Sequence, residues 1–462
     1  MKKKLKWCSL LILFLLCLIV IPITFSKYTK SFNRSITVNV RKPEYKIKFN
    51  ANGGTGTMAN LDMVYGTAKN LTANTFTRTN ANFLGWNTKA DGTGTSYSDK
   101  QSVKNLSSTD KDTVNLYAKW QLRYTVTFNS NGGSSVPSQN VFDGLTATKP
   151  SDPTKPDYIF DGWQLNGADY NFATPVTGNI TLTAKWKSTS TLLDGLALSA
   201  KIRSLANNGA TISDAYKYED SKTKAIKYAT ETQYEAMKSS LNDARNLIST
   251  PGSPEKTYAW FDSSTGTTYF YSEAGKIYMN PDSQKIFAKM PNLTDISALA
   301  NFDTSKVTDT NRLFQNSNKL VNLSPIAGWD VSKVTDMRFM FGISSTTDKM
   351  ALTDKSLESL ANWDVSSVLD FNQMFKSCRN ITKLDSLARW NVSSAKDFEQ
   401  MFNYCTGLTD AKAIEGWDVT NVTNFNKMFD HTTNLTANGD NRPIFTSRPG
   451  TWDNNGTYKP ST

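Results

Sequence analysis

Hydrophobic and polar positions follow one repeated order through the C-terminal third of the chain, in the phrase Trp/Phe-Asp-Val-Ser-x-Val-x-Asp-x-x-x-Met-Phe. The opening aromatic residue of each copy stands at Phe302, Trp329, Trp363, Trp390 and Trp417. The closing phenylalanine follows twelve positions later, at Phe314, Phe341, Phe375, Phe402 and Phe429, and Phe287 adds one more. This period predicts stacked units, each of which buries its apolar face only against its neighbours.

Stacking places equivalent side chains of neighbouring units over one another. We therefore predict two aromatic ladders inside the core, made of Trp329, Trp363, Trp390, Trp417, Phe341, Phe375, Phe402 and Phe429. The Met-Phe pair is predicted to end a short helix that begins near Thr335 and its equivalents. Aromatic and thioether stripes in such a frame form the core rather than a cofactor site.

The aspartate that follows the opening aromatic residue forms a second series, Asp303, Asp330, Asp364 and Asp418, in which Asn391 breaks the line. Carboxylates aligned about 5 Å apart repel one another and need solvent, a turn amide or a cation. A calcium row requires about six to eight oxygen ligands per ion and a denser acidic motif. We expect these side chains to cap turns.

One step of the repeat is longer than the others by seven residues, and its insertion covers residues 342–356. Insertions in stacked repeats map to loops on one face, so this one is either a recognition feature or sequence drift. The last residues, 437–462, fall out of register and are expected to cap the open end of the core.

Two related segments precede the repeats, at residues 45–120 and 121–187. Each opens with alternating polar and apolar residues that lead into Asn-Gly-Gly, has an aromatic-x-Gly-Trp in the middle, and ends in Ala-Lys-Trp. Alternation with a period of two residues, interrupted by Asn-Gly-Gly turns, predicts small β-rich modules. The segments resemble the Listeria-Bacteroides repeat, or internalin B-repeat, which implies a β-grasp-like fold found in bacterial surface proteins.

The C-terminal repeats, over residues 277–429, resemble those of BspA-like leucine-rich-repeat surface proteins, from which Phe302 and Asn391 depart. This resemblance implies a leucine-rich-repeat-type α/β solenoid, assigned to residues 255–436. Residues 188–254 are predicted to be a helical spacer. In it Thr230-Glu231-Thr232-Gln233 has the capping-box pattern ahead of apolar positions that continue to Ile248. The fold class is therefore multidomain α+β.

The N-terminus reads as an export signal. Residues 1–26 combine lysines with an apolar run and predict either a cleaved signal peptide or an uncleaved membrane anchor. Residues 27–44 are a short leader. The net charge of +11 falls to +7 without the four lysines of residues 1–26. Such a mildly basic protein can attract anionic envelope polymers, but no basic run argues for nucleic acid.

Cys378 and Cys405 lie 27 residues apart at equivalent positions of neighbouring units. Stacking brings them about 5 Å apart, which permits a disulfide if the side-chain directions allow it. The alternative is a pair of buried, small apolar side chains, and cysteine is commonly buried in this way.

Catalytic patterns are absent. The chain contains one histidine, His431, which lies where the last unit ends, and no Ser-His-Asp or His-Cys candidate accompanies it, so acyl-transfer catalysis has little support. The isolated His431 and the two cysteines do not make a zinc spacing. No cofactor is expected. We predict an exported, non-catalytic, adhesin-like surface protein that binds an extracellular protein or polysaccharide through its repeats. The alternatives are a structural envelope or stalk protein and, less favoured, a secreted hydrolase.

Overall fold

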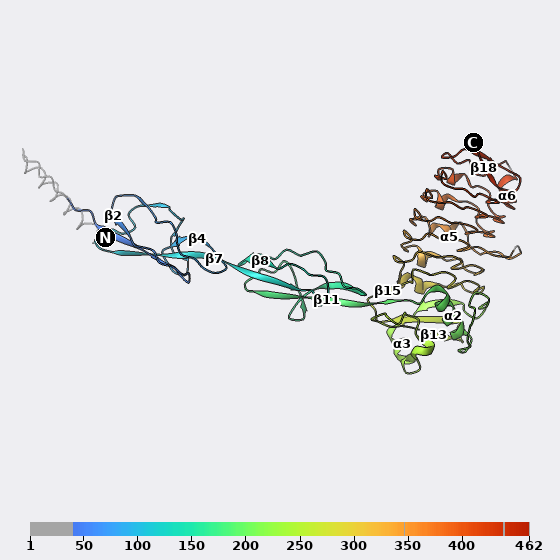
Figure 1. Cartoon of the computed structure of the whole chain (residues 1–462), viewed down its shortest axis with the longest axis horizontal. Helices are drawn as coiled ribbons and strands as arrows, with labels where there is room; N and C mark the ends of the chain where they lie inside the picture. Colours follow the sequence, from blue (N-terminus) through green and yellow to red (C-terminus); the bar gives the residue numbers. More distant parts are fainter. Residues whose placement is uncertain (1–39, 346, 438, 462) are drawn as a thin grey trace, which may run out of the picture. The chain divides into compact units, whose positions relative to one another are not determined.

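The computed structural model describes residues 40–345, 347–437 and 439–461. The chain divides into two compact units at Tyr124 and Thr125, and most of its regular elements are strands (Figure 1). The predicted signal or anchor, residues 1–26, and most of the predicted leader, residues 27–44, lie outside the described residues.

The first unit is a small β-rich module. Its strands are β1 (Glu44–Asn50), β2 (Leu61–Val64), β3 (Lys69–Asn70), β4 (Ala81–Asn87), β5 (Ser96–Tyr97), β6 (Ser102–Val103) and the first part of β7 (Thr113–Asn129). β1 pairs antiparallel with β2 and parallel with β7, and β4 pairs antiparallel with β7. The predicted alternation is confirmed, because β1 buries Tyr45, Ile47 and Phe49.

The glycine turn that occurs in both modules leaves space for a tryptophan side chain. A β-carbon on Gly54 would lie 2.7 Å from Cζ2 of Trp120, whose Nε1 donates to the Ala51 carbonyl at 2.8 Å. The second module repeats this arrangement, with Gly133 only 2.5 Å from Cζ2 of Trp186. Only glycine leaves room for the indole ring, which explains why Asn-Gly-Gly and Ala-Lys-Trp occur together.

The second module is built from the end of β7 and from β8 (Gln139–Phe142), β9 (Tyr158–Leu165), β10 (Ala168–Asp169) and β11 (Ile180–Thr191). β11 pairs parallel with β7 and antiparallel with β9. Its core centres on Trp163, whose ring lies 4.9 Å from Phe128 and 5.4 Å from Phe160. This tryptophan belongs to the aromatic-x-Gly-Trp motif.

The segment predicted as a helical spacer, residues 188–254, contains α2 (Gly195–Ala206), β12 (Ala225–Tyr228), α3 (Glu231–Lys238) and α4 (Asp243–Asn246). The predicted capping box is confirmed, since Thr230 and Gln233 bond reciprocally at the start of α3. The predicted extent of that helix is wrong, because α3 ends at Lys238 and Ile248 lies beyond α4.

Strand β12 joins β13 (Thr257–Asp262) and β14 (Thr267–Ser272) in a three-stranded sheet of order β12-β14-β13. One face of this sheet buries Ile226, Ala259 and Phe270 against Leu198 and Ile202 of α2. These side chains belong to the same hydrophobic cluster as the repeats that follow. Residues 188–254 therefore complete the core of the repeat region at its first layer.

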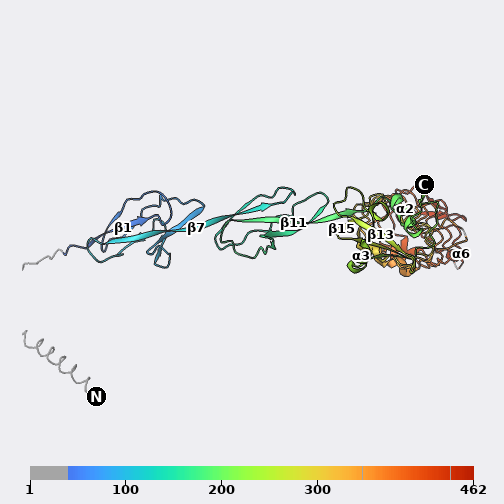
Figure 2. The ribbon, with the colours of Figure 1, turned by 90° about the horizontal axis from the view of Figure 1, so that it is seen from below.

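The repeat region, here called the turn region (residues 277–436), consists of short turns stacked layer upon layer (Figure 1). In Figure 2, turned by 90°, the traces of these layers overlap one another. Its regular elements are short: β15 (Lys276–Tyr278), η1 (Ser297–Asn301), β16 (Phe302–Asp303), η2 (Ser324–Ile326), α5 (Asp354–Glu358), η3 (Asp385–Leu387), η4 (Lys412–Ile414) and α6 (Thr433–Thr436). Parallel bridges join the layers at Asp282, Asp309, Asp336, Asp370, Asp397 and Asn424.

The helix predicted near Thr335 is wrong. Residues 335–341 form turns whose backbone groups pair with the next layer, as when Phe341 donates to the Met374 carbonyl at 3.0 Å. Three-residue spacing buries Val334, Met337 and Met340 here as it would in a helix. The pattern could not separate the two because both conformations bring every third or fourth residue inward.

The insertion at residues 342–356 is partly core. Ile343, Met350 and Leu352 are buried in the cluster that runs through the turn region. Gly342 is required at its position, since a β-carbon would lie 2.3 Å from the Gln373 carbonyl oxygen of the next layer. The insertion therefore widens one layer and is anchored by apolar side chains.

The C-terminal residues form a hairpin of β17 (Gly450–Trp452) and β18 (Tyr458–Pro460). Phe445 and Tyr458 pack on Phe425 with ring centroids 6.0 and 5.3 Å away, and Trp452 packs on Phe429 at 5.1 Å. These rings cover the last layer, so the apolar end of the stack is closed.

Candidate functional site

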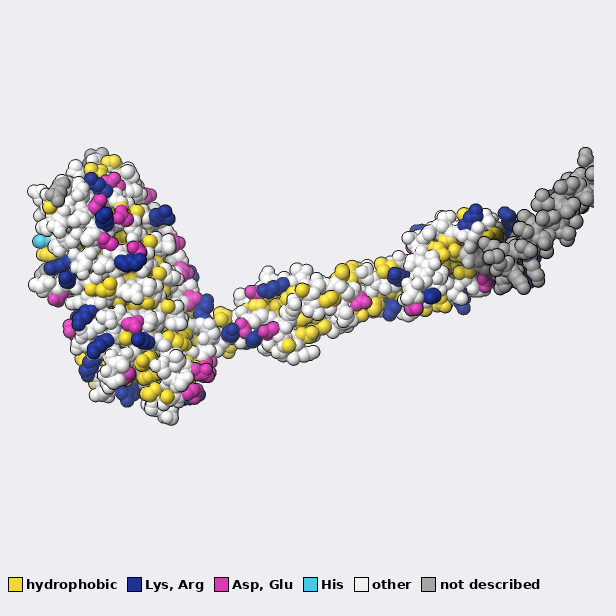
Figure 3. Space-filling view, turned by 180° about the vertical axis from the view of Figure 1, so that it is seen from behind, with side chains coloured by type: hydrophobic (Ala, Val, Ile, Leu, Met, Phe, Trp, Pro, Cys, Tyr) yellow, Lys and Arg dark blue, Asp and Glu magenta, His cyan; other side chains and the backbone are white. Residues whose placement is uncertain are grey.

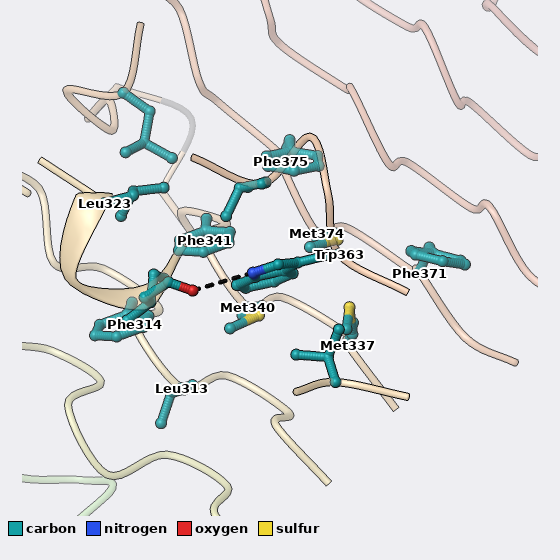
Figure 4. Close-up of a cluster of buried hydrophobic side chains, with 14 of the residues drawn as sticks. Leu313, Phe314, Leu323, Met337, Met340, Phe341, Trp363, Phe371, Met374 and Phe375 are labelled. Carbon is teal, nitrogen blue, oxygen red and sulfur yellow. Dashed lines mark hydrogen bonds between the residues drawn. The ribbon is translucent and has the colours of Figure 1, made fainter. Parts of the chain in front are cut away.

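The predicted aromatic ladders lie inside the turn region and are shielded from solvent. Successive ladder phenylalanines from Phe287 to Phe429 stack at 5.4–5.8 Å between ring centroids, and Trp329 with Trp363, and Trp390 with Trp417, stack at 6.5 and 6.4 Å. Each ladder tryptophan donates its Nε1 hydrogen to a carbonyl of the preceding layer, as Trp363 does to Ile326 at 3.1 Å (Figure 4). These residues form the core, so any contact with a partner must come from other positions.

The first aspartate series caps turns, as predicted. Asp330 accepts from the Ser332 amide at 3.0 Å and from its hydroxyl at 2.6 Å, and Asp418 does the same with Thr420. Asn391 accepts from the Ser393 amide at 3.2 Å, so an amide oxygen suffices where the carboxylate is missing. The hydrogen bond from Ser332 lowers the pKa of Asp330.

A second carboxylate series, which sequence reasoning missed, lies at the bridges between layers: Asp282, Asp309, Asp336, Asp370 and Asp397, ended by Asn424. Burial raises the pKa of Asp309, and it raises the pKa of Asp370 to about 6, while neighbouring aspartates add to both shifts. The signal in the sequence is the eighth position of the repeated phrase, which is aspartate in every copy except the last, where it is Asn424. Spacing alone does not show that these carboxylates lie between layers, because that placement depends on pairing with the neighbouring repeat.

One cation neutralises part of this series. Arg338 bonds Asp336 at 2.5 Å and reaches Asp370 in the next layer at 3.4 Å. Further along, Asn424 donates to Asp397 at 3.0 Å and to Glu399 at 3.2 Å. Arg338 and Asn424 thus offset part of the charge of the bridge series, and repulsion between its aspartates remains.

A third series points outward. At the position two residues before each ladder phenylalanine the backbone is left-handed, with φ between 54° and 59°, and the side chains are mostly long and polar. This left-handed row consists of Lys285, Arg312, Phe339, Gln373, Gln400 and Lys427. Its members are partly exposed or exposed, one in each layer. It places one accessible side chain at an equivalent position of each layer.

Large apolar side chains on the described turn-region surface are few. Val321 and Leu369 are 42% and 44% exposed and belong to different repeats. Figure 3 shows basic, acidic and apolar side chains interspersed over one side of this region. The accessible surface is therefore polar, without a broad apolar patch among the described residues.

The lone histidine lies at the edge of the last layer. His431 stacks on Tyr404 with ring centroids 4.1 Å apart, and its Nδ1 lies 3.1 Å from Asp430. The described chain gathers no group of three or more histidine, cysteine and carboxylate side chains able to hold a metal ion. No helix among residues 40–345, 347–437 and 439–461 combines the length and apolarity needed to cross a membrane.

Cys378 and Cys405 are fully buried free thiols. Their sulfur atoms point at carbonyls of the preceding layer, Cys378 toward Phe341 at 3.8 Å and Cys405 toward Phe375 at 3.1 Å. Burial raises the pKa of both thiols, that of Cys405 to about 12. Both act as small core side chains in this structure.

We expect Cys378 and Cys405 to resist alkylation in the folded protein. The thiolate is the reactive species, and here it is disfavoured and out of reach of the reagent. Iodoacetamide at pH 8 should modify both residues at least about a hundredfold more slowly than after unfolding in urea. Mass spectrometry of the tryptic peptides measures each site separately. Equal rates before and after unfolding would contradict the buried placement.

Residues 45–119 and 124–185 match the Listeria-Bacteroides repeat domain. This confirms the predicted pair of Listeria-Bacteroides repeats. Residues 282–352 and 343–444, which hold the stacked turns, match a family described as Mycoplasma protein of unknown function, DUF285. These matches do not test the likeness to BspA-like proteins, which stays a prediction.

Two proteins of Evansella cellulosilytica are similar over shorter stretches. A "Putative Gly-rich membrane protein" is 36% identical over 110 residues, which is 23% of this chain and 12% of the relative. A "Putative membrane protein" is 40% identical over 84 residues, 17% of this chain and 13% of the relative. The chain therefore spans a small part of the length of both relatives. No solved structure matches.

Proposed function

We propose that this protein is exported and displayed at the cell surface, where the turn region binds an extracellular protein or glycan without catalysis. The turn region would be a leucine-rich-repeat-type solenoid of the BspA-like kind, and the two Listeria-Bacteroides repeats, as β-grasp-like modules, would form a stalk. The repeat matches and the relatives named as membrane proteins support an envelope location.

The left-handed row is the observation that carries this proposal. A residue other than glycine at positive φ costs roughly 1 kcal/mol or more, and glycine or asparagine would relieve it. The chain nevertheless keeps Lys285, Arg312, Phe339, Gln373, Gln400 and Lys427 there, in six successive layers. Because these long side chains are present despite the free-energy cost of positive φ, we infer that the side chains themselves have a role in binding.

Binding by such a row would be multivalent. Layers repeat at the 5.4–5.8 Å separation of the ladder rings, so a linear partner meets similar side chains at regular intervals. Each contact is weak, and several on one rigid frame add up without large loss of conformational freedom. Lys376 illustrates the local order, since its Nζ bridges Gln373 at 3.1 Å and Gln400 at 2.8 Å across two layers.

Substituting glycine in the left-handed row should weaken ligand binding without weakening the fold. The variant Gln373→Gly, Gln400→Gly, Lys427→Gly keeps the backbone amides that pair with the next layers. We expect its free energy of unfolding to stay the same or rise by up to about 1 kcal/mol per position, because left-handed backbone suits glycine. Its affinity for the ligand should fall about tenfold or more.

The measurement is binding of the full-length protein to a panel of immobilised matrix proteins and of neutral and anionic polysaccharides. A matched control is Lys100→Gly with Lys111→Gly, two left-handed lysines of the first module, which should leave binding unchanged. Undiminished binding by the three-residue variant would remove the row from the binding surface. Absence of any ligand in the panel would favour a structural role.

A structural envelope protein is the second candidate. The polar surface of the described turn region, with its separate apolar residues, suits a spacer as well as a binding head. A secreted hydrolase has less support, since Asp336, Asp370 and Asp397 of the bridge series already contact Arg338 or Asn424.

A further inference from the structure

Three cations surround one tyrosine ring at the first layers of the turn region. Lys289 Nζ lies 4.6 Å, Lys285 Nζ 5.2 Å and Arg312 Cζ 5.8 Å from the ring centroid of Tyr216. Arg312 also lies 5.0 Å from the ring centroid of Phe339. The Tyr216 cluster is defined as Tyr216, Lys285, Lys289, Arg312, Gln315 and Phe339.

The tyrosine is held rigidly although it comes from a loop far away in the sequence. Its hydroxyl donates to Oε1 of the buried Gln315 at 2.8 Å, and Gln315 in turn donates to the Ser344 hydroxyl at 2.9 Å. The Tyr216 amide donates to Asp214 at 3.1 Å, which closes the loop on itself. A fixed ring gives the three cations a common platform.

The backbone fixes the cations too. Lys285 and Lys289 donate their amides to the Asn311 and Gln315 carbonyls, and Arg312 donates to the Arg338 carbonyl at 2.8 Å. All three residues have positive φ, between 53° and 59°. Their side chains therefore leave the stack from defined points in neighbouring layers.

Among the described residues these three cations pair with no carboxylate, whereas others nearby do. Lys217 pairs with Asp214 at 3.5 Å and Arg338 with Asp336 at 2.5 Å. The Nε of Arg312 is buried and has no hydrogen-bond partner. Its Nη1 donates to Oδ1 of Asn311 at 2.7 Å, a neutral partner that orients the guanidinium. A cluster of like charges without a carboxylate partner is electrostatically unfavourable by itself and favourable once an anion enters.

Carboxylates of the same layers have partners of their own. Asp282 accepts from the Gln284 amide and side chain, at 3.2 and 3.1 Å, and Asp309 accepts from the Asn311 amide at 2.7 Å. Behind the cluster a further cation, Arg203, is 1% exposed and donates to the Ile286 and Ala288 carbonyls. Asp220, whose amide donates to the Lys289 carbonyl, attracts Arg203 and accepts from the Lys222 and Thr223 amides. With Asp220 set against Arg203, the charge left over at this place is the positive charge of the three cluster cations.

We propose that the Tyr216 cluster binds a sulfate or phosphate ester group carried by an extracellular polymer. Guanidinium and ammonium groups gathered around one ring can each donate to the oxygens of a tetrahedral oxyanion, and the aromatic rings give the polymer an apolar surface to contact. This inference rests on the proposed function and names the chemistry of one part of the binding surface.

The test uses the full-length protein and three probes: heparin, N- and O-desulfated heparin, and polyglycerol phosphate. We expect heparin or polyglycerol phosphate to bind, with affinity that falls as salt rises. Desulfated heparin should bind at least about tenfold more weakly than heparin if sulfate is the recognised group. Preference for polyglycerol phosphate over heparin would identify a phosphate ester instead.

The variant Lys285→Gln, Lys289→Gln, Arg312→Gln should bind the anionic probe about tenfold to a hundredfold more weakly. Glutamine suits positions 285 and 312, since Gln373 and Gln400 occupy the same left-handed position in later layers. At position 289 it keeps a long polar side chain without the charge. The matched control Lys319→Gln, Lys383→Gln, Lys412→Gln removes three exposed lysines elsewhere on the turn region and should change affinity less than about threefold.

Tyr216→Ala should weaken binding while Tyr216→Phe, which keeps the ring, should retain most of it. If the cluster variant and the control variant lose affinity for the anionic probe equally, the loss reflects net charge alone, and the proposal is overturned. Failure of every anionic probe, while a neutral glycan or a matrix protein binds in the wider panel, would overturn this inference and leave the proposed function standing. Failure of all ligands would overturn both.

Discussion

Trp390→Ala is expected to lower the free energy of unfolding of the turn region by about 3–5 kcal/mol. Trp390 is 3% exposed, and its ring contacts Trp417 at 6.4 Å, Phe371 at 6.0 Å and Phe375 at 6.3 Å. Truncation removes the apolar transfer term, leaves a cavity between two layers, and deprives the Leu360 carbonyl of its 2.9 Å hydrogen bond.

Urea denaturation of the full-length protein, followed by far-ultraviolet circular dichroism, measures this loss. Trp390→Phe is the matched control, because it keeps an aromatic ring in the ladder and removes the indole donor. Its loss should be smaller than that of Trp390→Ala by at least about 1 kcal/mol. An unchanged denaturation midpoint for Trp390→Ala would place this tryptophan outside the core and contradict the stacked arrangement.

The loss should spread beyond one repeat. Each layer buries its apolar residues against its neighbours, so a gap at Trp390 weakens contacts on both sides. The hydrophobic cluster is continuous from Leu192 to Tyr458, which makes the three-stranded sheet and the C-terminal hairpin parts of the same folding unit. The three-stranded sheet and the C-terminal hairpin therefore shield the two apolar ends of the stack from solvent.

The repeated aromatic positions were predictable because a stack forces equal side chains into equal places. The ladders of Phe341 and Trp390, the turn-capping Asp330 and the capping box at Thr230 all follow from local spacing and local hydrogen bonds. The two β-rich modules followed from Asn-Gly-Gly and Ala-Lys-Trp for the same reason, since Gly54 and Trp120 touch.

Other features depend on contacts that no local pattern encodes. Tyr216 meets Gln315 across 99 positions of sequence, and the sheet of residues 225–272 joins the core of the first layer. The left-handed row was hidden because Gln373 and Gln400 are not residues that signal positive φ, as glycine and asparagine do. Without that signal, three-residue spacing looked helical.

Replacing a bridge carboxylate is expected to raise the free energy of unfolding, whereas replacing Trp390 is expected to lower it. Asp370→Asn is expected to raise the free energy of unfolding at pH 7.5 by about 1–3 kcal/mol. Burial, and then Asp397 and Asp336, raise the pKa of Asp370 to about 6, against an ordinary value of about 3.9 in an unfolded chain. Its side chain is 29% exposed, which limits the screening of this effect by solvent.

The direction of the pH dependence follows from which state holds the proton. Between about pH 4 and pH 6 the folded protein keeps Asp370 protonated while the unfolded chain ionises. The contribution of Asp370 to stability is therefore complete below about pH 4 and is lost as the pH rises through about 6. The difference between Asp370→Asn and the parent protein should vanish at pH 4 and reach its full size above pH 7.

The chain itself shows that asparagine fits. Asn424 occupies the bridge position of the last layer and accepts from the Asn426 amide at 3.0 Å, as Asp370 accepts from the Asn372 amide at 2.9 Å. Arg338, which loses a partner at 3.4 Å in the variant, keeps Asp336 at 2.5 Å. The substitution removes a buried charge and preserves the local turn.

Denaturation midpoints at pH 4, 5.5 and 7.5 measure the effect, with Asp330→Asn as the control. Hydrogen bonds from Ser332 lower the pKa of Asp330, so its replacement should reduce stability at neutral pH, opposite to Asp370→Asn. Destabilisation by Asp370→Asn at pH 7.5 would mean that attraction to Arg338 outweighs the cost of burying the carboxylate. In that case the bridge series would stabilise the stack as an ion-pair network, and its aspartates would be ionised throughout the neutral range.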